Sequence, residues 1–163
     1  MTQEFLVLLI ADYMVIPVLI LGVWAILSLP KNVRYQAVCR LIMSGLTALL
    51  IAKLLGVVYQ PAEARPYVLL GLPAGASALD NHGFPSDHAL FVATIVVAVW
   101  FETRSRSVSL ILAVMAILVC LGRVLAYVHT PLDVVVGVII ATLAGVVWHW
   151  PVLTKSKRLR KNL

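Results

Sequence analysis

The sequence predicts an all-α fold, a bundle of about five membrane-spanning helices, on three observations. Hydrophobic residues make up 62% of the 163 residues, charged residues make up 12%, and the mean hydropathy is +1.02. An ordinary soluble domain is nearer half apolar and a quarter charged, and disordered or collagen-like chains carry still fewer apolar side chains. The apolar residues also form long continuous runs, without the alternation that is typical of β-barrel strands.

Four runs are long enough, or nearly so, to cross a bilayer core about 30 Å thick, which takes about 20 mostly apolar residues. These runs are Phe5–Leu29, Gln36–Tyr59, Ser107–Val128 and Pro131–Trp150. The first has no basic segment before it and is longer than the apolar part of a signal peptide. We therefore expect it to remain in the protein as the first span.

Two shorter apolar stretches lie between the second and fourth of these predicted helices. Ser86–Phe101 has 16 residues and is expected to span, because the chain must cross the membrane between its neighbours. Tyr67–Leu79 has 13 residues and contains Gly71, Pro73 and Gly75. Its length and its turn residues predict a re-entrant or interfacial segment.

The positive charges predict the orientation, since Lys and Arg are enriched on the cytoplasmic side. Placing the basic C-terminal tail inside accounts for ten of the 13 cations on the inner side: Lys31, Arg34, Arg40, Arg104, Arg106, Lys155, Lys157, Arg158, Arg160 and Lys161. The N-terminus and the loop 60–85 then lie outside. Lys53, Arg65 and Arg123 remain in the outer half, where topology does not explain them.

Ionisable residues within spans are costly and usually functional. With a rise of 1.5 Å per residue, Lys53 lies about 9 Å and Arg123 about 6 Å below the outer ends of their helices. The other ionisable or polar residues expected at this depth or at outer helix ends are Asp12, Arg65, Ser86, Asp87, His88, His129 and Asp133. Segments far apart in sequence are thus predicted to meet at one depth.

The segment 84–88 is typical of a helix start. Ser86 is predicted to cap the helix, and Asp87 suits its positive end. The free N–H groups of such an end favour a bound phosphate. The alternative is an ordinary capped helix in which His88 has no chemical role.

The segment 123–133 contains a second helix start. Thr130 is predicted as its N-cap and Asp133 as the third helical residue of a capping box. Asp133 could bond only these backbone donors, or it could accept from His129 and leave the other imidazole nitrogen free to act. Arg123 could bind a phosphate oxygen, or it could be a snorkelling arginine beside an interfacial histidine.

Together these residues resemble the three signature motifs of the type 2 phosphatidic acid phosphatase superfamily, which is shared with vanadium haloperoxidases. The resemblance covers roughly residues 50–150. The motifs are Lys53…Arg65-Pro66, then Pro85-Ser86-Asp87-His88, then Arg123-x5-His129-x3-Asp133. The third fits fully in residue type and spacing.

Two departures from the family pattern stand out. Eleven residues separate Lys53 from Arg65, where the family usually has six. Asp87 stands where the family most often has glycine, and this form is similar to the bacterial undecaprenyl pyrophosphate phosphatase branch. Many relatives also have six spans, so we expect this chain to lack the counterpart of the first.

The resemblance implies a mechanism and its residues. His129 is the nucleophile and forms a phosphohistidine, Asp133 orients it, and His88 protonates the leaving oxygen and then activates water. The phosphate oxygens are bound by Lys53, Arg65, Arg123 and Ser86. No metal and no cofactor is expected, because three cations and a helix end can supply the charge neutralisation that phosphoryl transfer requires.

The resemblance also implies the function. Residues 1–163 are expected to form one membrane-embedded phosphatase domain, with its motif-bearing core at 50–150 and a basic cytoplasmic tail at 151–163. We expect it in the bacterial plasma membrane, with the N-terminus and active site outside, hydrolysing undecaprenyl pyrophosphate to undecaprenyl phosphate in cell wall biogenesis. The alternatives are a phosphatidylglycerophosphate or phosphatidic acid phosphatase, or a non-catalytic membrane scaffold.

The expected partners are the lipid phosphate substrate and membrane lipids, with no nucleic acid; the sequence leaves the oligomeric state open. Asp12 could pair with Lys53 or reach outward, and His82 is expected to be exposed in a polar loop. His149 is expected to anchor the inner interface, between two tryptophans. Cys39 and Cys120 lie at different depths, so no bridge between them is expected.

Overall fold

The structure is a computed structural model that describes residues 3–59, 65–79, 83–103 and 105–161, with the backbone alone for 153–161. The described residues form helices and no strand. In chain order these are α1 (Gln3–Leu8), the π-helix η1 (Leu9–Tyr13), α2 (Val15–Leu27), α3 (Lys31–Val58), α4 (Pro66–Leu69), α5 (Asp87–Glu102), α6 (Arg106–Leu125) and α7 (Pro131–Lys161).

The predicted all-α membrane bundle is confirmed. Four helical segments among the described residues are long and apolar enough to cross a bilayer: Gln3–Leu27, Lys31–Val58, Arg106–Leu125 and Pro131–Val152. Large apolar side chains point outward from these segments along their length, as expected for surfaces that face lipid. The chain is an integral membrane protein.

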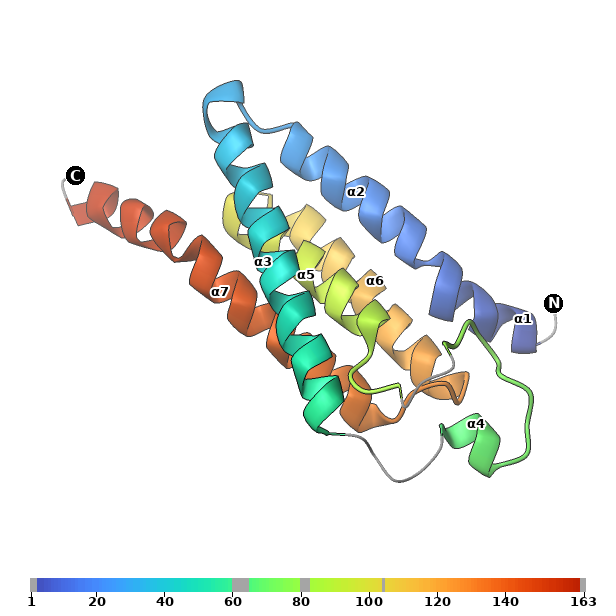
Figure 1. Cartoon of the computed structure of the whole chain (residues 1–163). Helices are drawn as coiled ribbons and strands as arrows, with labels where there is room; N and C mark the ends of the chain where they lie inside the picture. Colours follow the sequence, from blue (N-terminus) through green and yellow to red (C-terminus); the bar gives the residue numbers. More distant parts are fainter. Residues whose placement is uncertain (1–2, 60–64, 80–82, 104, 162–163) are drawn as a thin grey trace.

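The fifth predicted span, α5, is shorter than the others and lies at the centre of the bundle (Figure 1). Its 16 residues extend about 24 Å, less than the bilayer core. It packs against α2, α3, α6 and α7. Its buried side chains are Ala89, Leu90, Val92, Ala93, Thr94, Ile95, Ala98 and Val99. Because protein surrounds α5 on several sides, its length need not match the lipid.

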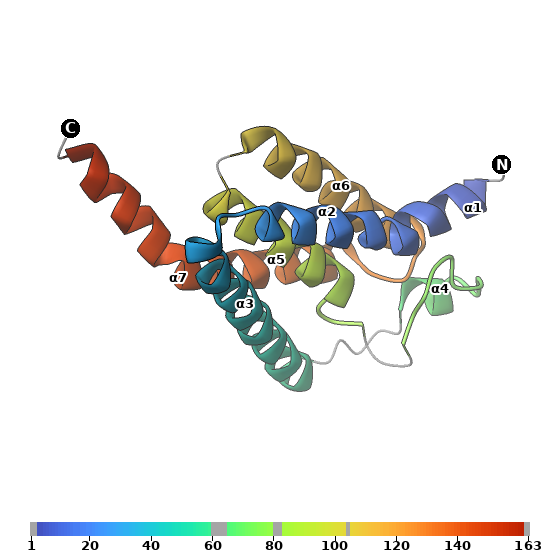
Figure 2. The same cartoon turned by 90° about the horizontal axis from the view of Figure 1, so that it is seen from above.

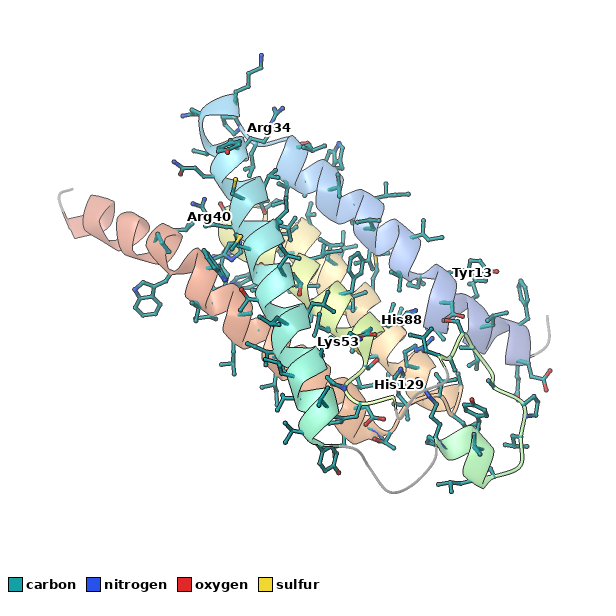
Figure 3. All side chains as sticks on the ribbon, viewed as in Figure 1. Tyr13, Arg34, Arg40, Lys53, His88 and His129 are labelled. Atoms are coloured by element: carbon teal, nitrogen blue, oxygen red, sulfur yellow. The ribbon has the colours of Figure 1, made fainter. Side chains whose placement is uncertain are left out.

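The stretch after residue 66 does not span, as predicted. It forms the four-residue helix α4 and then a turn and loop that return toward the bundle at one end (Figure 1). This is the end that also holds Lys53, His88 and His129 (Figure 3). We call it the site end.

Several helix boundaries differ from those predicted. The first span is interrupted by η1, which the length and apolar character of the run did not predict. The last helix continues past Pro151 to Lys161, and its final turns project beyond the bundle (Figure 2). Lys and Arg are good helix formers, which is consistent with a helix that continues beyond the predicted end of the span at Trp150.

His149, at the opposite end of the bundle, does not lie where it was predicted. Its side chain is fully buried and is not an interfacial anchor. The Nδ1 atom lies 2.9 Å from the Gly145 carbonyl oxygen, and Nε2 lies 3.4 Å from Oε1 of Glu102. Arg40 donates to both oxygens of Glu102, at 2.6 and 2.9 Å. The imidazole can be buried inside the bundle because these polar partners, which come from α3, α5 and α7, surround it. Both cysteines are free, as expected.

Candidate active site

Five of the seven predicted site residues line one cavity of about 290 Å³ at the site end. Lys53 comes from the last turns of α3, His88 from the first turn of α5, and Arg123 from the last turn of α6. Arg65 precedes α4, and His129 lies in the turn between α6 and α7. Figure 3 shows Lys53, His88 and His129 at this end of the bundle. The predicted convergence of distant segments therefore occurs.

Ser86 lies at the N-cap position of α5, but its side chain does not cap the helix. The backbone N–H of Ser86 donates to the Asp133 carbonyl oxygen at 3.0 Å, which joins the starts of α5 and α7. A Cβ atom at Gly137 would lie 2.8 Å from the Ser86 carbonyl oxygen, so this approach requires glycine. The hydroxyl of Ser86 is buried without a hydrogen-bond partner among the described residues. Ser86 supports the cavity wall but does not line the cavity.

Asp133 forms the predicted capping box at the start of α7. Its Oδ2 atom accepts from the Thr130 backbone N–H at 2.7 Å, and its own N–H donates to Thr130 Oγ1 at 3.3 Å. The His129 Nδ1 atom lies 3.7 Å from the same Oδ2, which is longer than a hydrogen bond. Of the two alternatives left open by the sequence, the structure shows the backbone bonds, with the imidazole adjacent.

The His129 side chain is 5% exposed. Burial lowers the pKa of its imidazole, because the charged form loses hydration, and Arg123 and Arg65 act in the same direction. The neighbouring Asp133 carboxylate opposes them. A buried imidazole with a lowered pKa is held in the neutral form, which has the free lone pair a nucleophile needs.

Arg123 is buried, with 2% of its surface exposed, and its guanidinium reaches across the site end. Nη1 donates to Asp12 Oδ1 at 2.5 Å, and Nη2 donates to the Ser77 carbonyl oxygen at 2.6 Å. Nε is buried without a partner among the described residues. Asp12 thus pairs with Arg123, and both readings made for it from the sequence, a pair with Lys53 or an outward orientation, were wrong.

Lys53 instead pairs with Asp87. Its ammonium lies 2.9 and 2.8 Å from the two carboxylate oxygens of Asp87, and both side chains are about half exposed.

Arg65 is buried and donates from Nη1 to the Val128 carbonyl oxygen at 2.7 Å. Burial lowers the pKa of Arg65, and the neighbouring Tyr67 and carboxylates oppose this shift. The guanidinium of Arg65 nevertheless remains a cation at neutral pH, because an arginine side chain is not deprotonated in proteins.

An apolar groove of about 550 Å³ adjoins the polar cavity. It runs between α2, α3 and α5, and its walls include Leu19, Ile26, Leu46, Leu90, Phe91 and Ile95. Lys53 and Asp87 line both the groove and the cavity. A polar site that accommodates an anion is therefore continuous with a surface that accommodates a hydrocarbon chain.

The cavity combines two histidines with three cations, which is chemistry suited to a phosphate. Among the described residues, no three His, Cys, Asp or Glu side chains are grouped so that they could hold a metal ion. His82 and Arg104 lie outside the described residues.

The family model of the PAP2 superfamily matches residues 37–157, about three quarters of the chain.

The chain belongs to the PAP2 superfamily. PAP2 proteins are phosphatases and membrane helical bundles, so the chain is a membrane phosphatase of this superfamily. Comparison with curated proteins and with solved structures gave no match. The matched segment contains all seven predicted site residues, and Asp12 lies outside it.

Two features of the site end were not predicted from the sequence: the presence of Ser77 and the pairing of Asp12 with Arg123. Asp12 carried a usable signal, since a carboxylate inside a span requires a cation or a polar partner. Ser77 carried none, because it lies in a loop that is held by a tertiary contact, the bond from the Gly75 N–H to the Ala126 carbonyl oxygen at 3.2 Å. Its Oγ and N–H both donate to Asp12, at 2.9 and 2.8 Å.

Proposed function

We propose that this PAP2 protein hydrolyses a lipid phosphate or pyrophosphate at the outer leaflet without a metal, through a phosphohistidine intermediate. One observation carries the proposal: the cavity with two histidines and three cations adjoins the apolar groove, and Lys53 and Asp87 line both. A lipid phosphate has both parts, an anionic headgroup and a hydrocarbon chain. A water-soluble phosphate ester would leave the groove unused.

The first half of the reaction is assigned to His129. Nδ1 faces Asp133, so Nε2 is the nitrogen that attacks phosphorus. The bond from phosphorus to the lipid oxygen breaks as the N–P bond forms, and the imidazole becomes positively charged. The Asp133 carboxylate at 3.7 Å stabilises that charge and is held in place by its bonds to Thr130.

The second half is assigned to His88. In the first step it gives a proton to the leaving lipid oxygen. It then takes a proton from water, which attacks phosphorus, releases phosphate and restores His129. Arg65, Arg123 and Lys53 neutralise the phosphoryl oxygens, and the backbone N–H groups at the start of α5, which Ser86 precedes, provide further donors. Phosphoryl transfer depends mainly on such positioning and charge neutralisation.

Undecaprenyl pyrophosphate is the proposed substrate and undecaprenyl phosphate the product, which returns the lipid carrier to cell wall synthesis. The aspartate of the second motif and the apolar groove support this choice. We place the protein in the bacterial plasma membrane, with the site end outside and the basic tail in the cytoplasm, since ten of the 13 cations then lie inside. A phosphatidylglycerophosphate or phosphatidic acid phosphatase is the second candidate, because its substrates share both parts.

The test is a substrate panel with purified protein in detergent and EDTA. A polyprenyl pyrophosphate, phosphatidylglycerophosphate and phosphatidic acid are compared by phosphate release. We expect the polyprenyl pyrophosphate to react fastest and His129→Ala to abolish release. His82→Ala, which removes a histidine from outside the motifs, serves as the control. Release by His129→Ala at the wild-type rate would refute the nucleophile. No release from any lipid by wild type would favour a non-catalytic scaffold.

A further inference from the structure

We propose that Asp12 is a positioning residue of the active site, which orients Arg123 and supports the protonated form of His88. The inference rests on the proposed function, in which Arg123 binds phosphate and His88 is the acid. Asp12 lies on the first span, outside the segment that matches the PAP2 superfamily. The site therefore includes a group that the superfamily motifs do not supply.

The local structure of the first span brings Asp12 to the site. Asp12 lies in η1, a π-helical turn within an otherwise α-helical segment. Such turns are rare and occur often at functional sites. Ala11 is fully buried against Gly122, where an added Cβ atom would lie 2.8 Å from the Ala11 backbone nitrogen. This contact places Asp12 directly beside Arg123, the residue after Gly122.

Asp12 joins three segments through its two carboxylate oxygens. Oδ1 accepts from Arg123 Nη1 at 2.5 Å and from Ser77 Oγ at 2.9 Å, and Oδ2 accepts from the Ser77 N–H at 2.8 Å. Arg123 in turn donates from Nη2 to the Ser77 carbonyl oxygen. The guanidinium is thus held from two sides, in one orientation, before any phosphate binds.

Asp12 also lies next to His88. Its Oδ1 atom is 3.6 Å from His88 Nε2, just beyond hydrogen-bond distance. The charged and titratable groups that act on His88 are Arg123, Asp12, His129 and Asp87. Asp87 is bonded to Lys53, so Asp12 is the carboxylate adjacent to the imidazole that faces it from another helix.

These contacts predict an exchange of partners when a phosphate binds. A phosphoryl oxygen at Arg123 competes with Asp12 for Nη1. The released carboxylate oxygen can then accept from Nε2–H of His88 and stabilise the imidazolium. With Nε2 directed to Asp12, Nδ1 is the nitrogen that can give its proton to the leaving lipid oxygen. Substrate binding and the protonation of His88 are thereby linked through the carboxylate of Asp12.

The experiment compares Asp12→Asn, Asp12→Glu and the control Glu4→Gln in purified protein in detergent. Glu4 is an exposed carboxylate of the same span, away from the cavity. We expect Asp12→Asn to lower kcat at least about tenfold with a smaller change in KM. We also expect the alkaline limb of its kcat profile to move to lower pH by about one unit, since an opposite charge at this distance favours the imidazolium by that much or more. Asp12→Glu should restore part of kcat and part of the shift in the alkaline limb. Glu4→Gln should leave kcat and the alkaline limb as in wild type.

A second readout does not depend on catalysis. The His88 ring is titrated by NMR in histidine-labelled protein, with His88→Gln used to assign its signal. Asp12→Asn should lower the midpoint of the His88 titration relative to wild type. If the alkaline limb and the midpoint both stay in place, Asp12 has only a structural role and the proposal is wrong. If wild type hydrolyses no lipid phosphate, the proposed function fails, and the NMR titration still decides whether Asp12 supports His88.

Discussion

Lys53 Nζ lies 2.8 Å from Asp87 Oδ2, at the boundary between the apolar groove and the polar cavity. The pair joins the end of α3 to the start of α5. Eleven residues separate Lys53 from Arg65, yet both line the cavity, so the longer spacing does not remove the lysine from the site. If Lys53 binds phosphate as proposed, Asp87 competes with that phosphate for the ammonium.

Replacing Asp87 should therefore strengthen phosphate binding. Asp87→Asn removes the competing charge, and an exposed ion pair of this kind contributes up to about 1 kcal/mol. We expect inorganic phosphate to inhibit the variant about fivefold more strongly than wild type, as measured by its inhibition constant. In a Lys53→Met background the same substitution should give no gain. An equal gain in both backgrounds would show that Lys53 does not bind the phosphate.

Arg123→Lys should lower kcat/KM by about a hundredfold, or about 2.7 kcal/mol of transition-state stabilisation. The guanidinium holds Asp12 with Nη1 and the Ser77 carbonyl with Nη2, and one ammonium cannot keep both partners and bind phosphate. The matched control is Arg106→Lys, an exposed arginine whose guanidinium lies 4.3 Å from the Trp100 ring centre at the far end. Its activity should equal that of wild type; a comparable loss would indicate a general effect of removing arginine.

The pH profile of kcat/KM should have its acidic limb below the ordinary histidine pKa of 6.5. His129 must be neutral to attack, and burial lowers the pKa of its imidazole, so it takes up a proton only at a lower pH than a free histidine does. The unfolded chain takes up that proton near pH 6.5, so this group also weakens folding as the pH falls below that value. An acidic limb centred above 6.5 would contradict the assignment of His129.

Filling the apolar groove should lower the activity on lipid substrates and leave the activity on soluble substrates unchanged. Gly45 lines the groove, and a Cβ atom there would lie 3.6 Å from Thr94 Cγ2, an ordinary contact, so Gly45→Phe can be built into the groove. We expect about a tenfold loss with a long-chain polyprenyl pyrophosphate and no loss with a short water-soluble phosphate ester. Leu110→Phe, at an exposed position of α6, is the control. Equal losses with both substrates would argue against a chain in the groove.

Activity should persist in EDTA. Arg65, Arg123 and Lys53 line the cavity and provide the positive charge that a metal supplies in many phosphoryl transfers. Phosphate release from the preferred lipid is measured with increasing chelator and compared with a metal-dependent phosphatase assayed in parallel. A loss of activity that is reversed by adding a divalent ion would refute the metal-free mechanism.

Much of this protein could be predicted from its sequence. Composition and run length predict the spans, because lipid requires long apolar helices in which the backbone bonds to itself. Helix-start chemistry predicts the capping box of Thr130 and Asp133, because capping depends on residues only three apart. Lys53, Arg65 and Arg123 are the cations that the predicted orientation does not explain, which makes them candidate site residues. All three line the cavity.

The tertiary structure alone decides which of these groups are partners. Neither alternative for Asp12, a pair with Lys53 or an outward orientation, included Arg123, because depth along a helix does not show which neighbouring helix a side chain contacts. His149 was assigned to the interface because a sequence cannot show that Glu102 and Phe101 of α5 lie beside it.

The sequence by itself therefore determined the membrane fold, the capped start of α7 and the residue types of the candidate site, since these depend on local composition and short spacing. The packing of the helices against one another determined the rest. The contact of η1 with α6 brings Asp12 to Arg123, and the contact of α3 with α5 brings Lys53 to Asp87. Lys53 and Asp87 line both the groove and the cavity. The physical reason is that partners from different helices meet only where close packing allows, as at Gly122 and Gly137.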